Sequence, residues 1–255
     1  MTDLVINREH VKKTFADYTS LYDASNEKIR LKIEHTYKVA DICEQIARSE
    51  GLDDSETDLA WLLGMLHDVG RFEQIRQYGT FIDADSVDHA QFGADILFKQ
   101  GRIRDYIPDN QEDDLIEKAI RVHNRYQVPE NLSQREVFYA DLLRDADKVD
   151  IIRVNVETPL EEIYNVTTEE LKQAPVTPEV MQAFEEHHTI ERSLMKASID
   201  HVVGHIALVY GLVYKKSREI VKEQGFLDQI MNFESENKVT QKALKRIREV
   251  MKEYL

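Results

Sequence analysis

The chain has 255 residues, of which 42% are hydrophobic and 32% charged, so it is long enough for one large domain with a full core. Its formal net charge of −15 disfavours long nucleic acid as a partner, because binding to a phosphate backbone needs a basic face. A small phosphorylated substrate stays compatible with this charge, since bound metal and a few cations can reverse the field locally.

The cysteine content and the apolar runs indicate a cytoplasmic protein. The single cysteine, Cys43, excludes a disulfide framework, suits a reducing compartment, and falls in an apolar pattern that predicts a core position. Residues 1–3 open no charged leader, and the longest apolar run, 206–213, is far too short to cross a membrane. We therefore expect no membrane partner, while a homodimer stays open.

Two helices are predicted at the start of the chain, over residues 7–19 and 27–48, from apolar residues spaced three and four apart. The second helix carries His35 inside its apolar stripe, between Leu31 and Val39. Taken alone, such a histidine is most simply a satisfied core residue, because a neutral imidazole needs only one or two partners.

A third helix is predicted from about Asp53, with Ser55 as its N-cap, and its apolar run leads into His67 and Asp68. We expect Gly70 to end this helix in the left-handed conformation. An ionisable pair at the inner end of a buried helix has to be compensated, because an unpaired buried carboxylate costs several kcal/mol. A bound cation is one remedy, and a partner Arg or Lys is another.

The middle of the chain is predicted as a loop over 71–85 and a helix over about 87–100, with Ser86 as its cap. A connection over 105–110 leads to a helix over 112–125, and a long helix follows over about 135–156. Each of these three helices carries an ionisable residue on its inward face; in chain order these are His89, His123 and Asp147.

The C-terminal part is predicted to be helical. Residues 158–178 hold three of the five prolines and are interpreted as short helical pieces and loops that could form a lid. Helices are expected over 179–188, 193–224 and 240–254, with an interruption at Gly225. His201 and His205 are interpreted as core or pocket-lining residues rather than a zinc pair. No alternating strand pattern occurs, so the predicted fold class is all-α, as one domain with a C-terminal helical extension.

Five predicted helices thus carry four histidines and two aspartates on their inward faces. Helix bundles build metal sites from inward side chains on facing helices. Imidazole together with carboxylate suits Mn, Fe, Co, Ni or Zn, and the remaining positions are left for water. The predicted ligands are His35, His67, Asp68, His89, His123 and Asp147.

The order His…His-Asp…Asp resembles the HD superfamily of metal-dependent phosphohydrolases. The residues that carry this order are His35, His67, Asp68 and Asp147. The supporting segments are EHTYKVADICEQIA, LLGMLHDVGRFEQ, DSVDHAQFGADIL and LLRDADKVDIIR, which together span about residues 28–155. The resemblance implies an HD-domain helical bundle over this range, with a helical extension or lid over 156–255.

The resemblance also implies a ligand set. One divalent ion, of Mn, Fe, Co, Ni, Zn or Mg, would be held by His35, His67, Asp68 and Asp147. His89 and His123 would bind a second ion, with Asp68 bridging the two, or would instead contact phosphate and protonate the leaving group. We favour two ions.

Two basic residues are predicted to neutralise phosphate oxygens: Arg71, just past the doublet, and Lys148, just past the last ligand. The alternative for both is a surface ion pair. Arg144, one turn before Lys148, could flank the same pocket, and its alternative is a solvated face.

The predicted function is hydrolysis of a small phosphate ester, a nucleotide or related metabolite, by a metal-activated water. One alternative is a non-catalytic, metal-stabilised module that binds nucleotides or regulates. A weaker alternative is a di-iron oxygenase, since some members of the superfamily use paired irons for oxidation.

Overall fold

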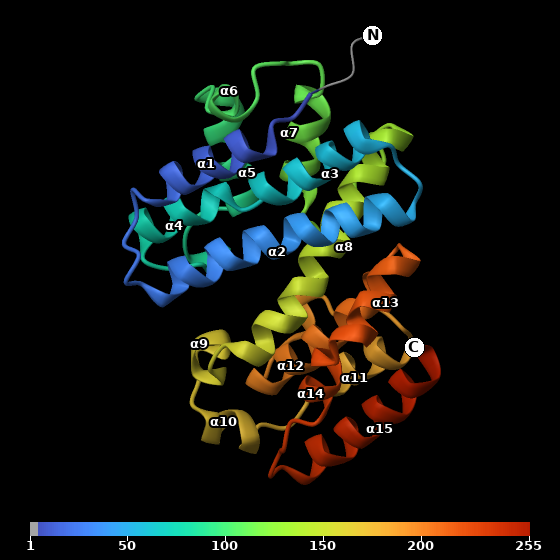
Figure 1. The fold of residues 1–255 in the computed structure, drawn as a ribbon. Coiled ribbons are helices and arrows are strands. Elements are labelled where there is room, and N and C mark those ends of the chain that lie inside the picture. Colours follow the sequence, from blue (N-terminus) through green and yellow to red (C-terminus); the bar gives the residue numbers. More distant parts are fainter. Residues whose placement is uncertain (1–4) are drawn as a thin grey trace. The chain divides into compact units, whose positions relative to one another are not determined.

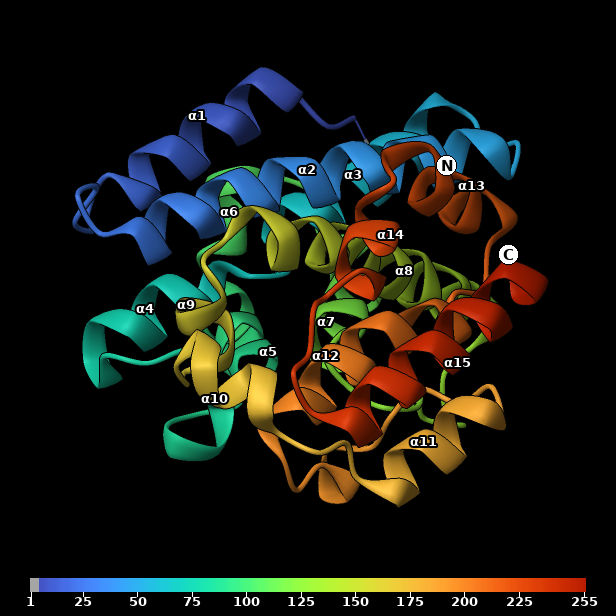
Figure 2. The same cartoon turned by 90° about the horizontal axis from the view of Figure 1, so that it is seen from below.

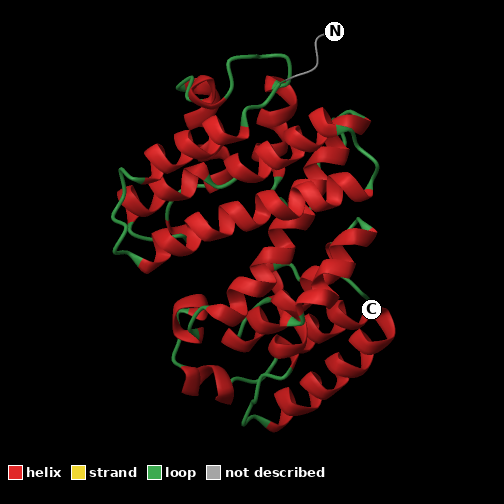
Figure 3. Ribbon diagram, in the orientation of Figure 1, coloured by secondary structure: helices red, strands yellow, loops and turns green. Residues whose placement is uncertain are grey.

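The computed structural model describes residues 5–255, so the prediction about a leader at residues 1–3 lies outside the described part. Within 5–255 the chain forms helices joined by loops and turns, without a strand (Figure 1, Figure 3). This confirms the predicted all-α fold class. No helix within these residues is long and apolar enough to cross a membrane.

The chain divides into two compact units, with the boundary between Asp147 and Lys148 inside the long helix α8 (Gln134–Glu157). The first unit contains α1 (Arg8–Thr19), α2 (Glu27–Ser49), α3 (Asp54–Leu66), α4 (Val69–Tyr78), α5 (His89–Ala94), α6 (Ile103–Tyr106), α7 (Asp113–Val122) and the first part of α8. A single domain over all 255 residues stays a prediction.

Helices α2 and α3 lie side by side in the first unit (Figure 1), and a glycine permits their close approach. A Cβ atom added to Gly64 on α3 would lie 2.5 Å from the Cα atom of Ala40 on α2. The two backbones therefore touch at a point one turn from His67 and little more than one turn from His35. This contact brings those two histidines to the same place.

Gly70 has a different role from the predicted one. Helix α3 ends at Leu66, and Gly70 is the second residue of α4, without a left-handed φ. A Cβ atom at Gly70 would lie 2.4 Å from the carbonyl oxygen of His89 and 2.6 Å from the backbone nitrogen of Gly93. Gly70 thus lets α4 and α5 touch, which sets His89 beside Asp68.

The loop predicted over 71–85 is wrong for residues 71–78, which belong to α4. The left-handed residue that ends this helix is Gly79, with φ of 69°. A single short 3-10 turn, Asp83–Asp85, lies in the remaining connection to α5.

Two predicted caps are also wrong. The N-cap of α3 is Asp53, whose Oδ1 accepts from the backbone nitrogen of Glu56 at 2.9 Å, while Ser55 is already helical. The N-cap of α5 is Asp88 rather than Ser86, because a cap has to stand directly before the first helical residue.

The second unit contains short helices and one long one. They are the end of α8, α9 (Leu160–Tyr164), α10 (Thr168–Gln173), α11 (Pro178–Glu185), α12 (Ser198–Ala207), α13 (Lys215–Gln224), α14 (Phe226–Met231) and α15 (Lys238–Tyr254). Helix α15 packs against α11 and α14 (Figure 2). The short pieces predicted over 158–178 and the interruption at Gly225 are confirmed.

The single helix predicted over 193–224 is wrong. Two 3-10 turns, Arg192–Leu194 and Leu208–Gly211, flank α12, and Leu212 and Tyr214 are extended, with ψ of 121° and 143°. The apolar run over 206–213 fits a buried segment in either conformation, so the hydrophobic pattern alone does not locate the break.

The two histidines of α12 differ in exposure: His201 is exposed and His205 is partly buried. Because His201 is exposed, of its two interpretations, as a core or a pocket-lining residue, the core position is wrong. The Nδ1 atom of His205 lies 3.2 Å from the hydroxyl of Tyr164, which donates to Oδ1 of Asn155 at 3.2 Å. Burial lowers the pKa of His205 to about 3, so the folded chain keeps this imidazole neutral.

The low pKa of His205 predicts a loss of stability in acid. The folded-state pKa of about 3 lies below the ordinary 6.5, so this contribution is present above pH 6.5 and is lost as the pH falls toward 3. Urea unfolding at pH 7.5 and pH 5 measures how much the free energy of unfolding falls between the two pH values. In His205→Gln this fall should be smaller than in the unmodified chain by on the order of 1–2 kcal/mol. The exposed His188→Gln is the control; equal losses in both variants would contradict the prediction.

The close approach at Gly70 predicts a costly substitution. Gly70→Ala should lower the free energy of unfolding by roughly 3 kcal/mol or more, because the new methyl group meets backbone atoms rather than flexible side chains. Gly51→Ala is the control, since its Cβ would meet nothing within 4 Å and only the positive φ of 78° is strained, at about 1 kcal/mol. Similar losses in urea unfolding would show that the α4–α5 contact is not tight.

Candidate metal centre

The first unit brings all six predicted ligands together. Four of them stand at helix ends: His67 after α3, Asp68 before α4, His89 at the start of α5 and His123 after α7. His35 lies within α2 and Asp147 within α8. The carboxylate of Asp68 caps no backbone group of α4, which leaves both of its oxygens for the interior.

One group of donors surrounds the Oδ2 atom of Asp68. The Nε2 atoms of His35 and His67 are 3.3 Å apart and lie 3.6 Å and 3.5 Å from this oxygen. The Oδ1 atom of Asp147 is 3.1 Å from Nε2 of His35 and 3.9 Å from Nε2 of His67. The donor atoms of His35, His67 and Asp147 are close enough to share one ion.

A second group surrounds the other oxygen of the same carboxylate. The Nε2 atoms of His89 and His123 are 3.1 Å apart and lie 3.6 Å and 3.9 Å from Oδ1 of Asp68. All four histidines and Asp68 are buried. Asp68 therefore faces one histidine pair with each of its oxygens, as a ligand shared by two ions would.

The hydrogen bonds of the rings show which nitrogens carry electron pairs. Nδ1 of His67 lies 2.7 Å from the carbonyl oxygen of Gly64, and Nδ1 of His123 lies 2.7 Å from that of Ile120. A carbonyl oxygen only accepts, so both rings carry their proton on Nδ1 and an electron pair on Nε2. Electron pairs aimed into one buried space are what a bound cation coordinates, so these residues fit a metal ion.

Burial keeps the histidines in the form that binds metal. It lowers the pKa values of His67 and His123. Burial, followed by the charge of Arg71, lowers the pKa of His89 to about 4. Burial alone would raise the pKa of Asp68, but the charge of Lys32 and other neighbours holds it well below its ordinary value.

Lys32 is a site residue that the sequence analysis missed. Its Nζ atom lies 2.7 Å from Oδ2 of Asp68, and its side chain is 19% exposed. Lys32 stands three residues before His35 on α2, so helical spacing could have pointed to it. It compensates the charge of Asp68, but it leaves the facing electron pairs of the histidines unexplained.

Arg71 lies beside the second donor group. Its Nη1 donates to the Phe81 carbonyl at 2.6 Å and to Oδ1 of Asp83 at 2.8 Å. Its Nε is buried without a hydrogen bond and lies 3.7 Å from Oδ1 of Asp68. One N–H of Arg71 is thus left for a further acceptor near the donors.

The two other predicted basic residues are held by carbonyl groups. Nη2 of Arg144 donates to the carbonyl of Tyr126 at 3.0 Å, and Arg144 is 7% exposed, so the alternative of a solvated face is wrong. Nζ of Lys148 donates to the carbonyl of Gly211 at 2.8 Å within the second unit. The phosphate-binding role of Lys148 stays a prediction.

Comparison with known protein families identifies the domain. Residues 33–152 match the model of the HD domain family, and this range contains all six donors. These residues form an HD domain, so the chain carries a domain of the HD superfamily. This superfamily is one of metal-dependent phosphohydrolases, and the clustered histidines and aspartates fit binding of a divalent metal. No curated protein and no solved structure gave a significant match.

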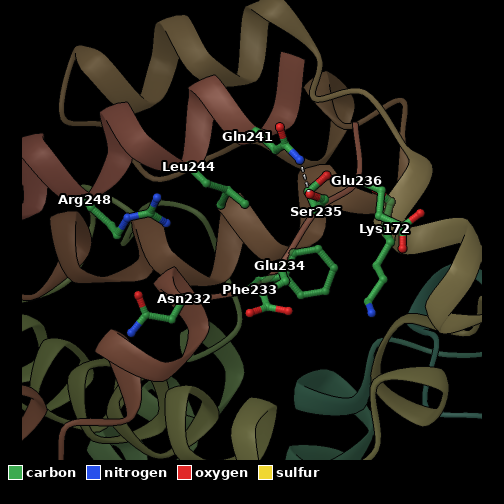
Figure 4. Close-up of a pocket in the computed structure, with 9 residues that line it drawn as sticks. All are labelled: Lys172, Asn232, Phe233, Glu234, Ser235, Glu236, Gln241, Leu244 and Arg248. Carbon is green, nitrogen blue, oxygen red and sulfur yellow. Dashed lines mark hydrogen bonds between the residues drawn. The ribbon is translucent and has the colours of Figure 1, made fainter. Parts of the chain in front are cut away.

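The second unit contains a pocket of its own (Figure 4). It has a volume of about 560 Å³, and Lys172 and Arg248 flank Phe233 and Glu234 along its wall. None of the residues that line it belongs to the predicted ligand set. It mixes cations and carboxylates and defines no ligand chemistry.

The two donor groups predict two ions per chain. Metal analysis of the purified full chain, loaded with Mn²⁺ and desalted, should give about two ions, since the shared carboxylate serves both groups. His123→Ala should retain about one ion, because the group of His35, His67 and Asp147 stays complete. A firm single ion in the unmodified chain would contradict the two-ion prediction. It would favour the alternative in which His89 and His123 contact the substrate phosphate.

Proposed function

We propose that this HD-superfamily chain is a phosphohydrolase that cleaves a small phosphate ester, a nucleotide or related metabolite. The position of Asp68 between two histidine pairs is the observation that carries the proposal. When bound, divalent ions would activate a water and stabilise the attacking and leaving oxygens. The residues His35, His67 and Asp147 would hold one ion, and His89 and His123 the other.

Two cations of the chain support a phosphate at this place. Lys32 and Arg71 approach the two oxygens of Asp68, with Nζ at 2.7 Å and Nε at 3.7 Å. Lys32 would donate a hydrogen bond to a phosphoryl oxygen, and the unpaired Nε–H of Arg71 would donate to another. Such donors, set in place before the substrate arrives, stabilise the negative charge on the phosphoryl and leaving-group oxygens in the transition state. They offset locally the net charge of −15.

An aromatic ring beside these cations supports a nucleotide over a purely aliphatic ester. The ring of Phe81 lies 6.0 Å from Nζ of Lys32 and 5.7 Å from Cζ of Arg71. A nucleobase on a phosphate held by these cations would be within reach of this apolar face. A monoester and a diester stay equally compatible with the arrangement.

Phosphate release from a nucleotide panel, with Mn²⁺, Co²⁺, Ni²⁺ or Mg²⁺ added, tests the proposal. The unmodified chain should turn over at least one nucleotide, and Asp68→Asn should lower kcat by roughly 1,000-fold or more, because one carboxylate serves both ions. Asp58→Asn, a carboxylate on α3 paired with Arg8, is the control. A tight nucleotide complex without turnover would favour the regulatory binder, and iron-dependent oxygen consumption would favour the oxygenase.

Lys32 provides a separate test of phosphate binding. Lys32→Ala should raise KM for the best substrate by about 10–100-fold, because a charge-assisted hydrogen bond to phosphate is lost. Lys38→Ala removes an exposed lysine from the same helix and should leave KM unchanged. Equal KM values in both variants would remove Lys32 from the site.

A further inference from the structure

The connection between α4 and α5 places a carboxylate against the second histidine pair. Asp83 lies in the short 3-10 turn of this connection, and its Oδ2 is 2.6 Å from Nδ1 of His89. The contact is made on the ring nitrogen opposite the one that faces His123 and Asp68. The sequence analysis missed Asp83 because nothing in a loop pattern predicts which side chain turns inward.

Asp83 is itself held from its other side. Its Oδ1 accepts from Nη1 of Arg71 at 2.8 Å and from Nε2 of Gln74 at 3.0 Å. Gln74 is fully buried, and its Nε2 also donates to the carbonyl of Val87 at 3.0 Å. Because two side chains of helix α4 hold this carboxylate, it cannot turn away from His89 without breaking several hydrogen bonds.

The neighbouring Asp88 does not compete for this role. Its Oδ1 accepts from the backbone nitrogens of Ala90 and Gln91, at 3.1 Å and 3.2 Å, as the cap of α5. The three residues Asp83, Asp88 and His89 are close enough to hold an ion. Their contacts instead give them different roles. Asp88 caps the start of α5, and Asp83 holds the imidazole ring of His89.

We propose that Asp83 is a positioning residue for His89, an inference that rests on the proposed function of the metal centre. Asp83 fixes the plane of the imidazole and keeps its proton on Nδ1, so that Nε2 offers an electron pair beside Nε2 of His123. This arrangement makes His89 a metal ligand rather than the acid that protonates the leaving group. A carboxylate behind a ligand histidine also strengthens the ligand.

The position of the proton on His89 is measured directly by nitrogen NMR. The full chain carries ¹⁵N-labelled histidine and is dialysed against a chelator, and His89→Gln identifies the signal of His89. In the unmodified chain His89 should show the Nδ1–H form. Asp83→Ala should convert it to the Nε2–H form or a mixture, while Asp85→Ala, an exposed neighbour in the same turn, should leave it unchanged.

Mn²⁺ titration of the same proteins measures the consequence. Asp83→Ala should weaken Mn²⁺ binding at His89 and His123 by about 10–100-fold, because Asp83 contacts a ring of this pair. Mn²⁺ binding at His35, His67 and Asp147 should be unchanged. If Asp83→Ala does not fold, Asp83→Asn replaces it and should give a smaller change in the same direction. An unchanged His89 signal with unchanged Mn²⁺ binding overturns the inference.

The two proposals fail in different ways. A chain that binds one ion or hydrolyses no ester contradicts the proposed function, while the His89 signal still decides what Asp83 does. A chain that binds two ions and turns over nucleotide, but whose His89 signal ignores Asp83, contradicts only this inference.

Discussion

One buried carboxylate organises the first unit. Asp68 is 2% exposed, and ionised carboxylates are rarely buried to this extent without a compensating charge. Lys32 provides part of that charge, and two histidine pairs surround its two oxygens. Since a buried charge is stable only among such partners, the helices that carry them have to meet at this point. The packing of the helices around Asp68 meets that requirement.

Close backbone contacts make the meeting possible. Gly64 lets α2 and α3 touch near His35 and His67, and Gly70 lets α4 and α5 touch near Asp68 and His89. Most of the donors lie at helix ends rather than along helix faces. A side chain at a helix end can turn toward a common centre, and the backbone there still has free carbonyl groups that orient imidazole rings.

The residues around the donors fall into two sets, one that orients the imidazole rings and one that supplies positive charge. On one side, carbonyl groups and a carboxylate hold the outer nitrogens of the rings, which leaves the inner nitrogens for metal. On the other side, Lys32 and Arg71 place cations beside the same carboxylate, where a phosphate would need them. The combination suits hydrolysis of a phosphate ester better than simple storage of an ion.

Much of this molecule was determined by its sequence alone. Apolar spacing identified α2, α8 and α15 and the inward position of His35, because these features depend on residues near one another in the chain. The ligand set, which is spread over distant segments, came from the family resemblance. Tertiary structure decided the rest. The sequence predicts Gly70 as the residue that ends a helix, yet in the structure Gly70 permits the close contact between α4 and α5. Lys32 became a site residue because α2 packs beside Asp68, and Asp83 because the turn before α5 folds back onto His89. Burial and tertiary contacts select among side chains that local patterns treat as equal.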